Sequence, residues 1–186
     1  IGAYIFYSCT LFFESLGFGS WSIYVLSLPF TILISAILGV ILERVLMRPM
    51  IGQHPFPAIM ITIGLISVLE GAAAIIWSSS AKYPPALIPL EIDFINSIAI
   101  NRQMLLSFIF AVLIFIVISY LFIKSKAGVA IRATASDQST AYIMGINVPK
   151  VFSLAWIIAA TTGAFAGLLL APLNSLTPTL GVVGLS

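Results

Sequence analysis

The sequence predicts an all-α membrane protein, a polytopic bundle of about five transmembrane helices with one short polar helix between two of them. Three observations carry this prediction. Hydrophobic residues make up 61% and charged residues only 8% of the 186 residues, apolar runs recur along the chain, and most charges gather in two connections. A soluble domain carries roughly 25% charged residues, so these few charges could not cover a water-exposed surface. The runs are continuous and not alternating, which excludes a transmembrane barrel.

Five runs are candidate spans within one transmembrane domain, residues 1–186. Each run is close to the ~20 residues that a helix needs to cross a ~30 Å hydrocarbon core. We expect the first run to be cut at its start and the chain to be a fragment of a longer membrane protein. The runs are residues 1–18, 23–46, 57–77, 103–123 and 151–172.

The basic residues predict the orientation of the bundle. Six of them lie in the second–third and fourth–fifth connections, whereas the other connections hold only Lys82 and Arg102. By the positive-inside rule the richer connections are cytoplasmic, which places residues 124–150 inside the cell. The chain then begins at the cytoplasmic side and ends outside. The six are Arg44, Arg48, Lys124, Lys126, Arg132 and Lys150.

The external connection, residues 78–102, contains a candidate β-hairpin. After several prolines the chain alternates as "EIDFINSIAIN". Asn96-Ser97 is a candidate turn between Ile92/Phe94 and Ile98/Ile100, as expected for two short paired strands.

The polar stretch "RATASDQSTAYIMGINVPK", residues 132–150, carries helix start and stop signals. Thr134 suits an N-cap, and Asp137 suits the first turn three residues later. Gly145 suits the C′ position, where a left-handed residue ends a helix, with Ile146 as the following contact. These signals predict a short helix along the membrane surface that docks a soluble partner.

The fifth run contains a row of small residues at every fourth position. Such rows let helix backbones approach closely in lipid, so we expect helix packing. A pore-lining role is the alternative. The row consists of Ala155, Ala159, Gly163, Gly167 and Ala171.

Glu70 is the one ionisable residue deep within a span, and an acid at that depth is a candidate functional residue. Ser67, Gly71 and Ala74 share its helical face, so we expect this face to look into the bundle. A carboxyl that only hydrogen-bonds a neighbouring helix is the alternative.

Polar residues interrupted by prolines follow the last span. They could line the outer part of a substrate pathway or form an ordinary external loop. The candidate pathway residues are Thr62, Ser67, Glu70, Asn174 and Pro178.

Several classes of site are poorly supported. The sequence shows no Ser–His pair, acidic dyad, metal-ligand cluster or Gly-rich phosphate loop, so we expect no catalytic residues, metal or cofactor. The net charge of +2 gives no case for nucleic-acid binding. Any ATP hydrolysis would belong to a separate chain.

The segment "GVAIRATASDQSTAYIMGINVPKVFSLAWIIAATTGAFAGLLLAPLNSLTPTLG" closely resembles permease subunits of branched-chain amino acid ABC importers. "IGAY", "ERVLMRPM" and "ITIGLISVLEGAA" extend the resemblance over the whole chain. It implies that residues 132–145 form the coupling helix that fits a groove on the ATPase subunit. Arg132, Thr134, Asp137, Ala141 and Gly145 would carry this contact. An acid usually precedes the family's alanine, whereas Thr140 stands there in this chain.

The expected function is therefore that of a permease subunit of an ABC importer for branched-chain or related amino acids. The resemblance implies a fragment of a longer permease, in a bacterial or archaeal inner membrane. Its implied partners are ABC ATPase subunits, a second permease subunit in a heterodimer, an external substrate-binding protein and the lipid bilayer. A urea or short-amide importer, and an ion-coupled secondary transporter that uses Glu70, are the alternatives.

Overall fold

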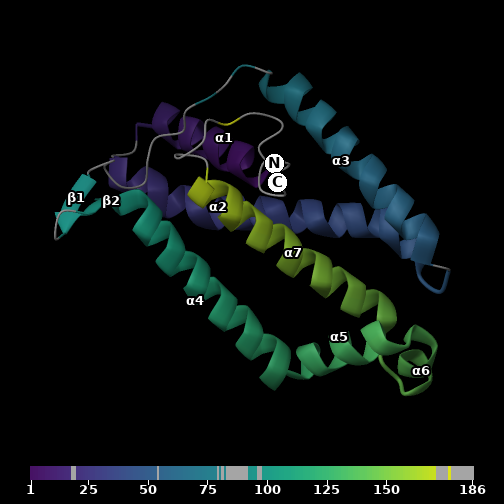
Figure 1. Ribbon diagram of the computed structural model, residues 1–186. Helices are drawn as coiled ribbons and strands as arrows, with labels where there is room; N and C mark the ends of the chain where they lie inside the picture. The colour runs from purple at the N-terminus through teal and green to yellow at the C-terminus, as the bar shows by residue number, and fades with distance from the viewer. Residues whose placement is uncertain are drawn as a thin grey trace.

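The computed structural model describes residues 1–17, 20–53, 55–78, 80, 82, 92–95, 98–170 and 176. Within these ranges the chain is almost entirely helical, with one two-stranded hairpin (Figure 1). In chain order the elements are α1 (Gly2–Ser15), α2 (Ser20–Leu42), the π-helix η1 (Glu43–Met47), the 3₁₀-helix η2 (Arg48–Met50), α3 (Pro55–Trp77), β1 (Ile92–Ile95), β2 (Ile98–Asn101), α4 (Arg102–Lys124), α5 (Lys126–Ser136), α6 (Gln138–Ile143) and α7 (Val148–Leu170).

Four helices of the described residues are long and apolar enough to cross a membrane. The four are α2 with its π and 3₁₀ extension, α3, α4 and α7. They lie close to the second to fifth predicted spans. Helix α1, which lies in the first predicted span, has 14 residues and is not one of these four.

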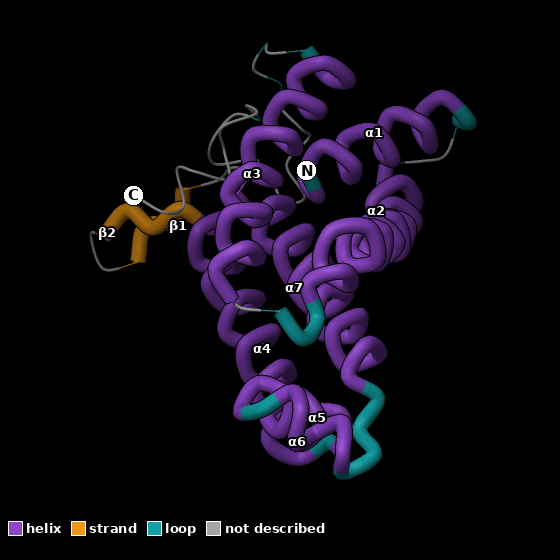
Figure 2. The backbone as a smooth tube through the Cα atoms, turned by 90° about the vertical axis from the view of Figure 1, so that its right-hand side faces the viewer, coloured by secondary structure: helices purple, strands orange, loops and turns teal. Residues whose placement is uncertain are grey.

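The predicted hairpin is confirmed. Strands β1 and β2 pair antiparallel, with Ile92 opposite Asn101 and Ile95 opposite Ile98. The two strands flank the predicted turn at Asn96-Ser97, which itself lies outside the described residues. The hairpin leads directly into α4, at the opposite end of the molecule from α5 and α6 (Figure 2).

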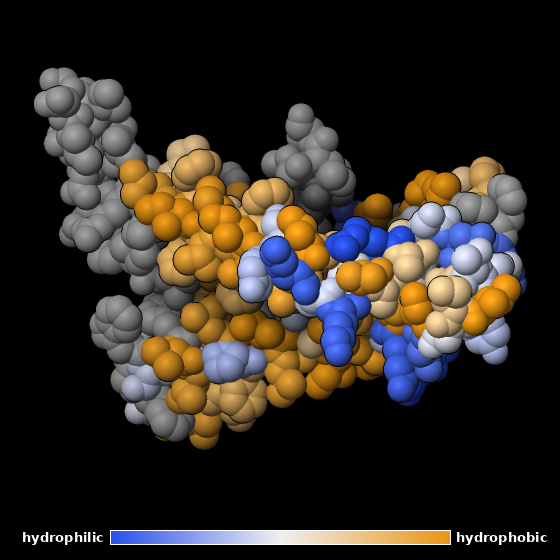
Figure 3. All heavy atoms as spheres, turned by 90° about the horizontal axis from the view of Figure 1, so that it is seen from below, coloured by the Kyte–Doolittle hydropathy of each residue, from blue (hydrophilic) through white to orange (hydrophobic). Residues whose placement is uncertain are grey.

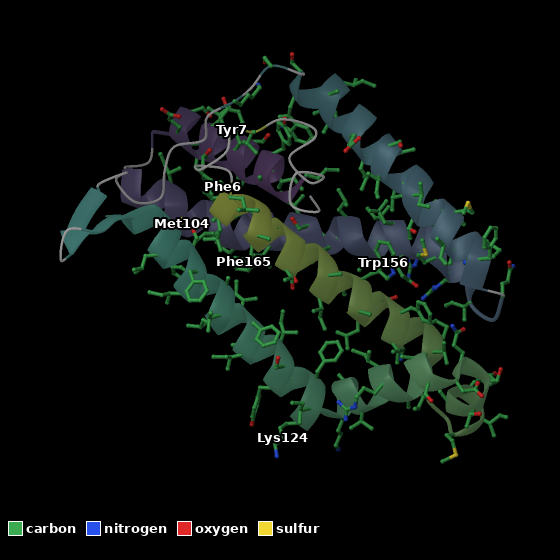
Figure 4. The ribbon with its side chains drawn as sticks, in the orientation of Figure 1. Phe6, Tyr7, Met104, Lys124, Trp156 and Phe165 are labelled. Carbon is green, nitrogen blue, oxygen red and sulfur yellow. The ribbon has the colours of Figure 1, made fainter. Side chains whose placement is uncertain are left out.

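Helices α1, α2 and α7 form the close-packed part of the fold. A β-carbon added at Gly39 of α2 would lie 2.7 Å from the Ala160 β-carbon and 2.9 Å from the Trp156 carbonyl oxygen of α7. Only glycine permits so close an approach of two backbones. Trp156 lies on α7 where that helix crosses α2 (Figure 4).

A second cluster joins α1 and α3. The Trp77 indole N–H donates to the Ser8 hydroxyl over 2.6 Å, and the Tyr4 and Trp77 rings lie 5.2 Å apart. Ala73 and Leu176 are buried against Tyr4. In Figure 1 α3 starts beside the end of α2, and the two helices diverge toward the end of α3, which makes this contact with α1.

Candidate functional site

The polar residues gather where α5 and α6 lie together at one end of the bundle (Figure 2). Seen from this end, hydrophilic side chains cover part of a surface that is otherwise apolar (Figure 3). Lys124, at the end of α4, points away from the helices (Figure 4). This is the end to which the charge distribution assigns the cytoplasm.

The polar stretch forms two helices and not one. Ser125 is the N-cap of α5, and its hydroxyl accepts a hydrogen bond from the Gly128 N–H at 2.9 Å. Thr134 is therefore not the N-cap that the sequence predicted. It lies buried near the end of α5 and donates to the Ala130 carbonyl over 2.8 Å. The exposed Arg132 donates to the Phe122 carbonyl, near the end of α4, where a cation is favourable.

Asp137 is the N-cap of α6, one turn later than the predicted start. Its carboxylate accepts from the Ser139 N–H at 2.8 Å, the Thr140 N–H at 3.1 Å and the Thr140 hydroxyl at 2.9 Å. The bonds from Thr140, and then the bond from Ser139, hold the pKa of Asp137 below its ordinary value of 3.8. Thr140 thus binds an acid through both its N–H and its hydroxyl.

The predicted end of α6 is confirmed. Gly145 has a φ of +84°, a left-handed conformation that other residues rarely adopt. Its N–H donates to the Tyr142 carbonyl, and the Ile146 N–H donates to the Ala141 carbonyl, both over 3.0 Å. These two bonds define a Schellman ending.

The end of α6 exposes three consecutive apolar side chains. Tyr142, Ile143 and Met144 are 72%, 82% and 77% exposed. Ala141, by contrast, is buried against the rest of the chain. An apolar tip on a helix fixed at both ends is typical of a surface that a protein partner covers.

The α2–α3 turn touches the start of α6. The Gly52 N–H donates to the Gln138 side-chain oxygen over 3.0 Å. A crevice of about 370 Å³ lies beside Gln138, between α5, α6 and the first turns of α7, with Phe152 in its wall.

The sequence-based search missed Glu43. Its side chain is fully buried in η1, where the Ser153 hydroxyl of α7 donates to Oε2 over 2.8 Å and Arg48 lies opposite. The signal was present in the spacing, because polar or small residues occupy every fourth position of this span. They are Ser27, Thr31, Ser35, Gly39 and Glu43.

The candidate pathway residues that the structure describes, Thr62, Ser67 and Glu70, all lie on α3, and no hydrogen bond joins them. Glu70 is half-buried, and the described residues include no hydrogen-bond or ion-pair partner for its side chain. Ser67 and Gly71 are exposed, and nothing lies within 4 Å of a β-carbon added at Gly71. The face expected to look into the bundle therefore looks away from this chain, because Leu69 and Ala73 face α1 and α2.

The other candidate pathway residues add no contact to this face. Thr62 is exposed and donates to the Ile59 carbonyl of its own helix over 2.8 Å. Asn174 and Pro178 lie outside the described residues.

Most of the small-residue row on α7 does not lie on the face that packs against α1 and α2. That face lies one residue further along the sequence. Ala159 and Gly163 are exposed, and space around Gly163 is open. Gly167 does pack, since an added β-carbon would lie 3.3 Å from Ala3. The closest contacts come from the adjacent row, in which Ala160 meets Gly39. Ala155 is half-buried beside the crevice, and Ala171 lies outside the described residues.

No group of three or more metal-ligating side chains occurs within the residues that the structure describes.

Comparison with known proteins gives a consistent result. The family model for the branched-chain amino acid transport system permease component matches residues 1–182. The BraD high-affinity branched-chain amino acid permease protein of Pseudomonas aeruginosa is 27% identical over 91% of this chain and 57% of its own length. The probable LivH permease protein of Methanocaldococcus jannaschii is 28% identical over 84% of this chain and 51% of its own. The chain thus spans about half the length of these relatives. No solved structure matches it significantly.

Proposed function

The chain belongs to the branched-chain amino acid transport permease family, and we propose that it is the membrane-spanning part of an ABC importer driven by separate ATPase chains. The observation that carries the ATPase-driven mechanism is α6. It is a six-residue helix with a carboxylate cap at one end, a Schellman ending at the other and an exposed apolar tip.

The geometry of α6 suits a mechanical contact. A six-residue helix is marginal by itself, so its two caps and the buried Ala141 are what hold it ready for a partner. The apolar tip, residues 142–144, would fill a groove on the ATPase, while Asp137 and Gly145 keep the helix rigid under load. Nucleotide binding would then move α6 and bias the spans between inward-facing and outward-facing states.

The remaining partners and the cargo follow from the family. The importer would pair this chain with a second permease subunit and receive its cargo from an external substrate-binding protein. Branched-chain or related amino acids are the proposed substrates, because the relatives' names specify branched-chain amino acids. The proposed location is a bacterial or archaeal inner membrane.

Reconstitution tests the energy source. We expect the permease, reconstituted with its ATPase and second permease subunit, to take up labelled leucine from the binding protein only when ATP is hydrolysed. Uptake that persists without the ATPase chains would overturn the proposal. Uptake that persists without ATPase and is abolished by Glu70→Gln would establish an ion-coupled transporter instead. Competition by urea or acetamide, tested in the same vesicles, would identify a short-amide importer.

The Gly145→Val variant tests the coupling contact. A β-branched residue is strained at a φ of +84°, so α6 should lose its ending while the spans still insert. We expect loss of ATPase recruitment or of coupled transport. Gly64→Val is the matched control, because the space around Gly64 is open. Normal ATPase stimulation in Gly145→Val would contradict the assignment of α6.

A further inference from the structure

Glu43 holds two elements together from a fully buried position. Its carboxyl group receives a hydrogen bond from Ser153 of α7 and faces Arg48 of η2. A carboxylate removed from water costs several kcal/mol unless such partners compensate. These contacts therefore favour one arrangement of the end of α2, the start of η2 and the first turns of α7.

The contact with Arg48 is looser than the contact with Ser153. Arg48 Nε lies 3.6 Å from Glu43 Oε1, which is an ion pair but too long for a hydrogen bond. Both atoms are buried, and neither has a hydrogen-bond partner among the residues that the structure describes. The pair consequently has unused bonding capacity, and a small shift of Arg48 would change how strongly Glu43 is compensated.

A short rigid turn connects Arg48 to α6. The Ile51 N–H donates to the Arg48 carbonyl over 3.3 Å, and the Gln53 N–H donates to the Met50 carbonyl over 3.1 Å. Gly52 lies in this turn and donates its N–H to Gln138, the first residue of α6. A continuous set of contacts thus runs from α6 to the buried end of α2 and on to α7.

The backbone at Glu43 is the part of this span that deviates from an α-helix. Residues 43–47 form a π-helix, and π-helical turns occur mostly as single turns at functional sites. The deviation coincides with the buried acid, so the irregular backbone turn and the ion pair lie in the same segment.

We propose that Glu43, Arg48 and Ser153 are positioning residues that transmit the movement of α6 to α2 and α7, through the hydrogen bond between Gln138 and Gly52. This inference rests on the proposed function, in which an ATPase moves α6. It adds a second route to the spans, in addition to the peptide chain that links α6 directly to α7.

Hydrogen exchange of the full chain in lipid nanodiscs tests the route without transport. Glu43→Gln keeps an acceptor for Ser153 and removes the ion pair. We expect amide exchange to rise about fivefold in α6 and in residues 148–153, which are remote in sequence. Arg44→Ala is the matched control, since Arg44 is an exposed cation in the same π-helix. Exchange that changes only within residues 43–53 would overturn the proposal.

Uptake per ATP hydrolysed tests the consequence in the reconstituted importer. Arg48→Ala and Ser153→Ala should each lower this ratio by about threefold or more, and Arg48→Lys should restore part of it. The double variant, Arg48→Ala with Ser153→Ala, should lower the uptake per ATP no further than the more damaging single variant does, because both substitutions break the same route. Multiplied effects, or an unchanged ratio, would contradict the route.

The two experiments separate the two proposals. A wild-type importer without ATP-dependent uptake would refute the proposed function, while the exchange experiment would still decide whether the route exists.

Discussion

Helices α2 and α4 have the same mean hydropathy but opposite surroundings. In the apolar window of the α2 span 22% of residues are buried within the chain, whereas none are in the window of α4. Helix α2 carries small or hydroxyl residues at every fourth position, and α4 carries large exposed side chains such as Phe108 and Phe115. Hydropathy therefore tells that a helix lies in the membrane, while small residues tell that it packs, since lipid tails are as apolar as leucine.

The largest loss of stability should come from a larger side chain in the row of small residues on α2, at the position where that row packs against α7. Gly39→Leu would force a side chain into Ala160 and the Trp156 backbone, and such overpacking costs about 3 kcal/mol. Unfolding by denaturant in detergent micelles measures the loss. Ala111→Leu, on the exposed face of α4, is the matched control and should leave stability unchanged. Equal losses in both helices would remove the contrast between them.

Truncating a buried leucine of α7 should cost more stability than truncating an exposed phenylalanine of α4, although the phenylalanine is the larger side chain. Leu168→Ala, at a buried position of α7, should cost about 2 kcal/mol, near the lower end for leucine because lipid replaces water as the alternative surrounding. Phe115→Ala removes more atoms but should cost almost nothing, since 70% of Phe115 is exposed. A larger loss for Phe115→Ala in the same unfolding measurement would show that α4 packs within the chain.

Lowering the pH should destabilise α6 but leave α2 and α7 folded. The pKa of Asp137 is lowered in the folded state, so its contribution is complete above the ordinary value of 3.8 and is lost as pH falls below it. We expect exchange protection in α6 to decrease below about pH 4 while α2 and α7 stay protected. Asp137→Ala should remove both this pH dependence and the protection. Simultaneous loss in all three helices would contradict a local cap.

The smallest effect should come from the hydroxyl groups of α2. The Ser35 hydroxyl is buried without a hydrogen-bond partner, so Ser35→Ala should change stability by less than about 0.5 kcal/mol. The same unfolding measurement checks this value. A loss of several kcal/mol would show that the hydroxyl groups of this row on α2, and not the small size of its side chains, stabilise the packing.

The sequence predicted features that depend on local chemistry. Gly145 ends α6 as expected, and β1 and β2 pair as expected, because a left-handed residue and an alternating pattern each have few structural solutions. The start of α6 was predicted one turn too early. Thr134 and Asp137 are both good caps, and only the end of α5 at Ser136 decides between them.

Features that depend on a neighbouring helix could not be predicted in the same way. A second row on α7 lies one position from the row of small residues, and the sequence does not say which of the two rows faces α2. This second row consists of Trp156, Ala160, Ala164 and Leu168. The structure selects Ala160 over Ala159 and Gly163 through the close approach at Gly39. Glu43 was not singled out from the sequence, although its spacing from Gly39 places it on the buried row.

The π-helix at the end of α2 has a consequence for insertions and deletions. A π-helical turn holds one residue more than an α-helical turn, as if a single residue had been inserted into the span. The wider turn absorbs that extra residue, so the residues that follow keep nearly the angle about the axis that an uninterrupted α-helix one residue shorter would give them. Deleting Val45 would therefore let the segment close as an α-helix with Arg48 still beside Glu43, whereas deleting a residue from the α-helical part of α2 would turn everything that follows by about 100°. The π-turn thus makes this one segment tolerant of a change in length that the rest of the span could not absorb.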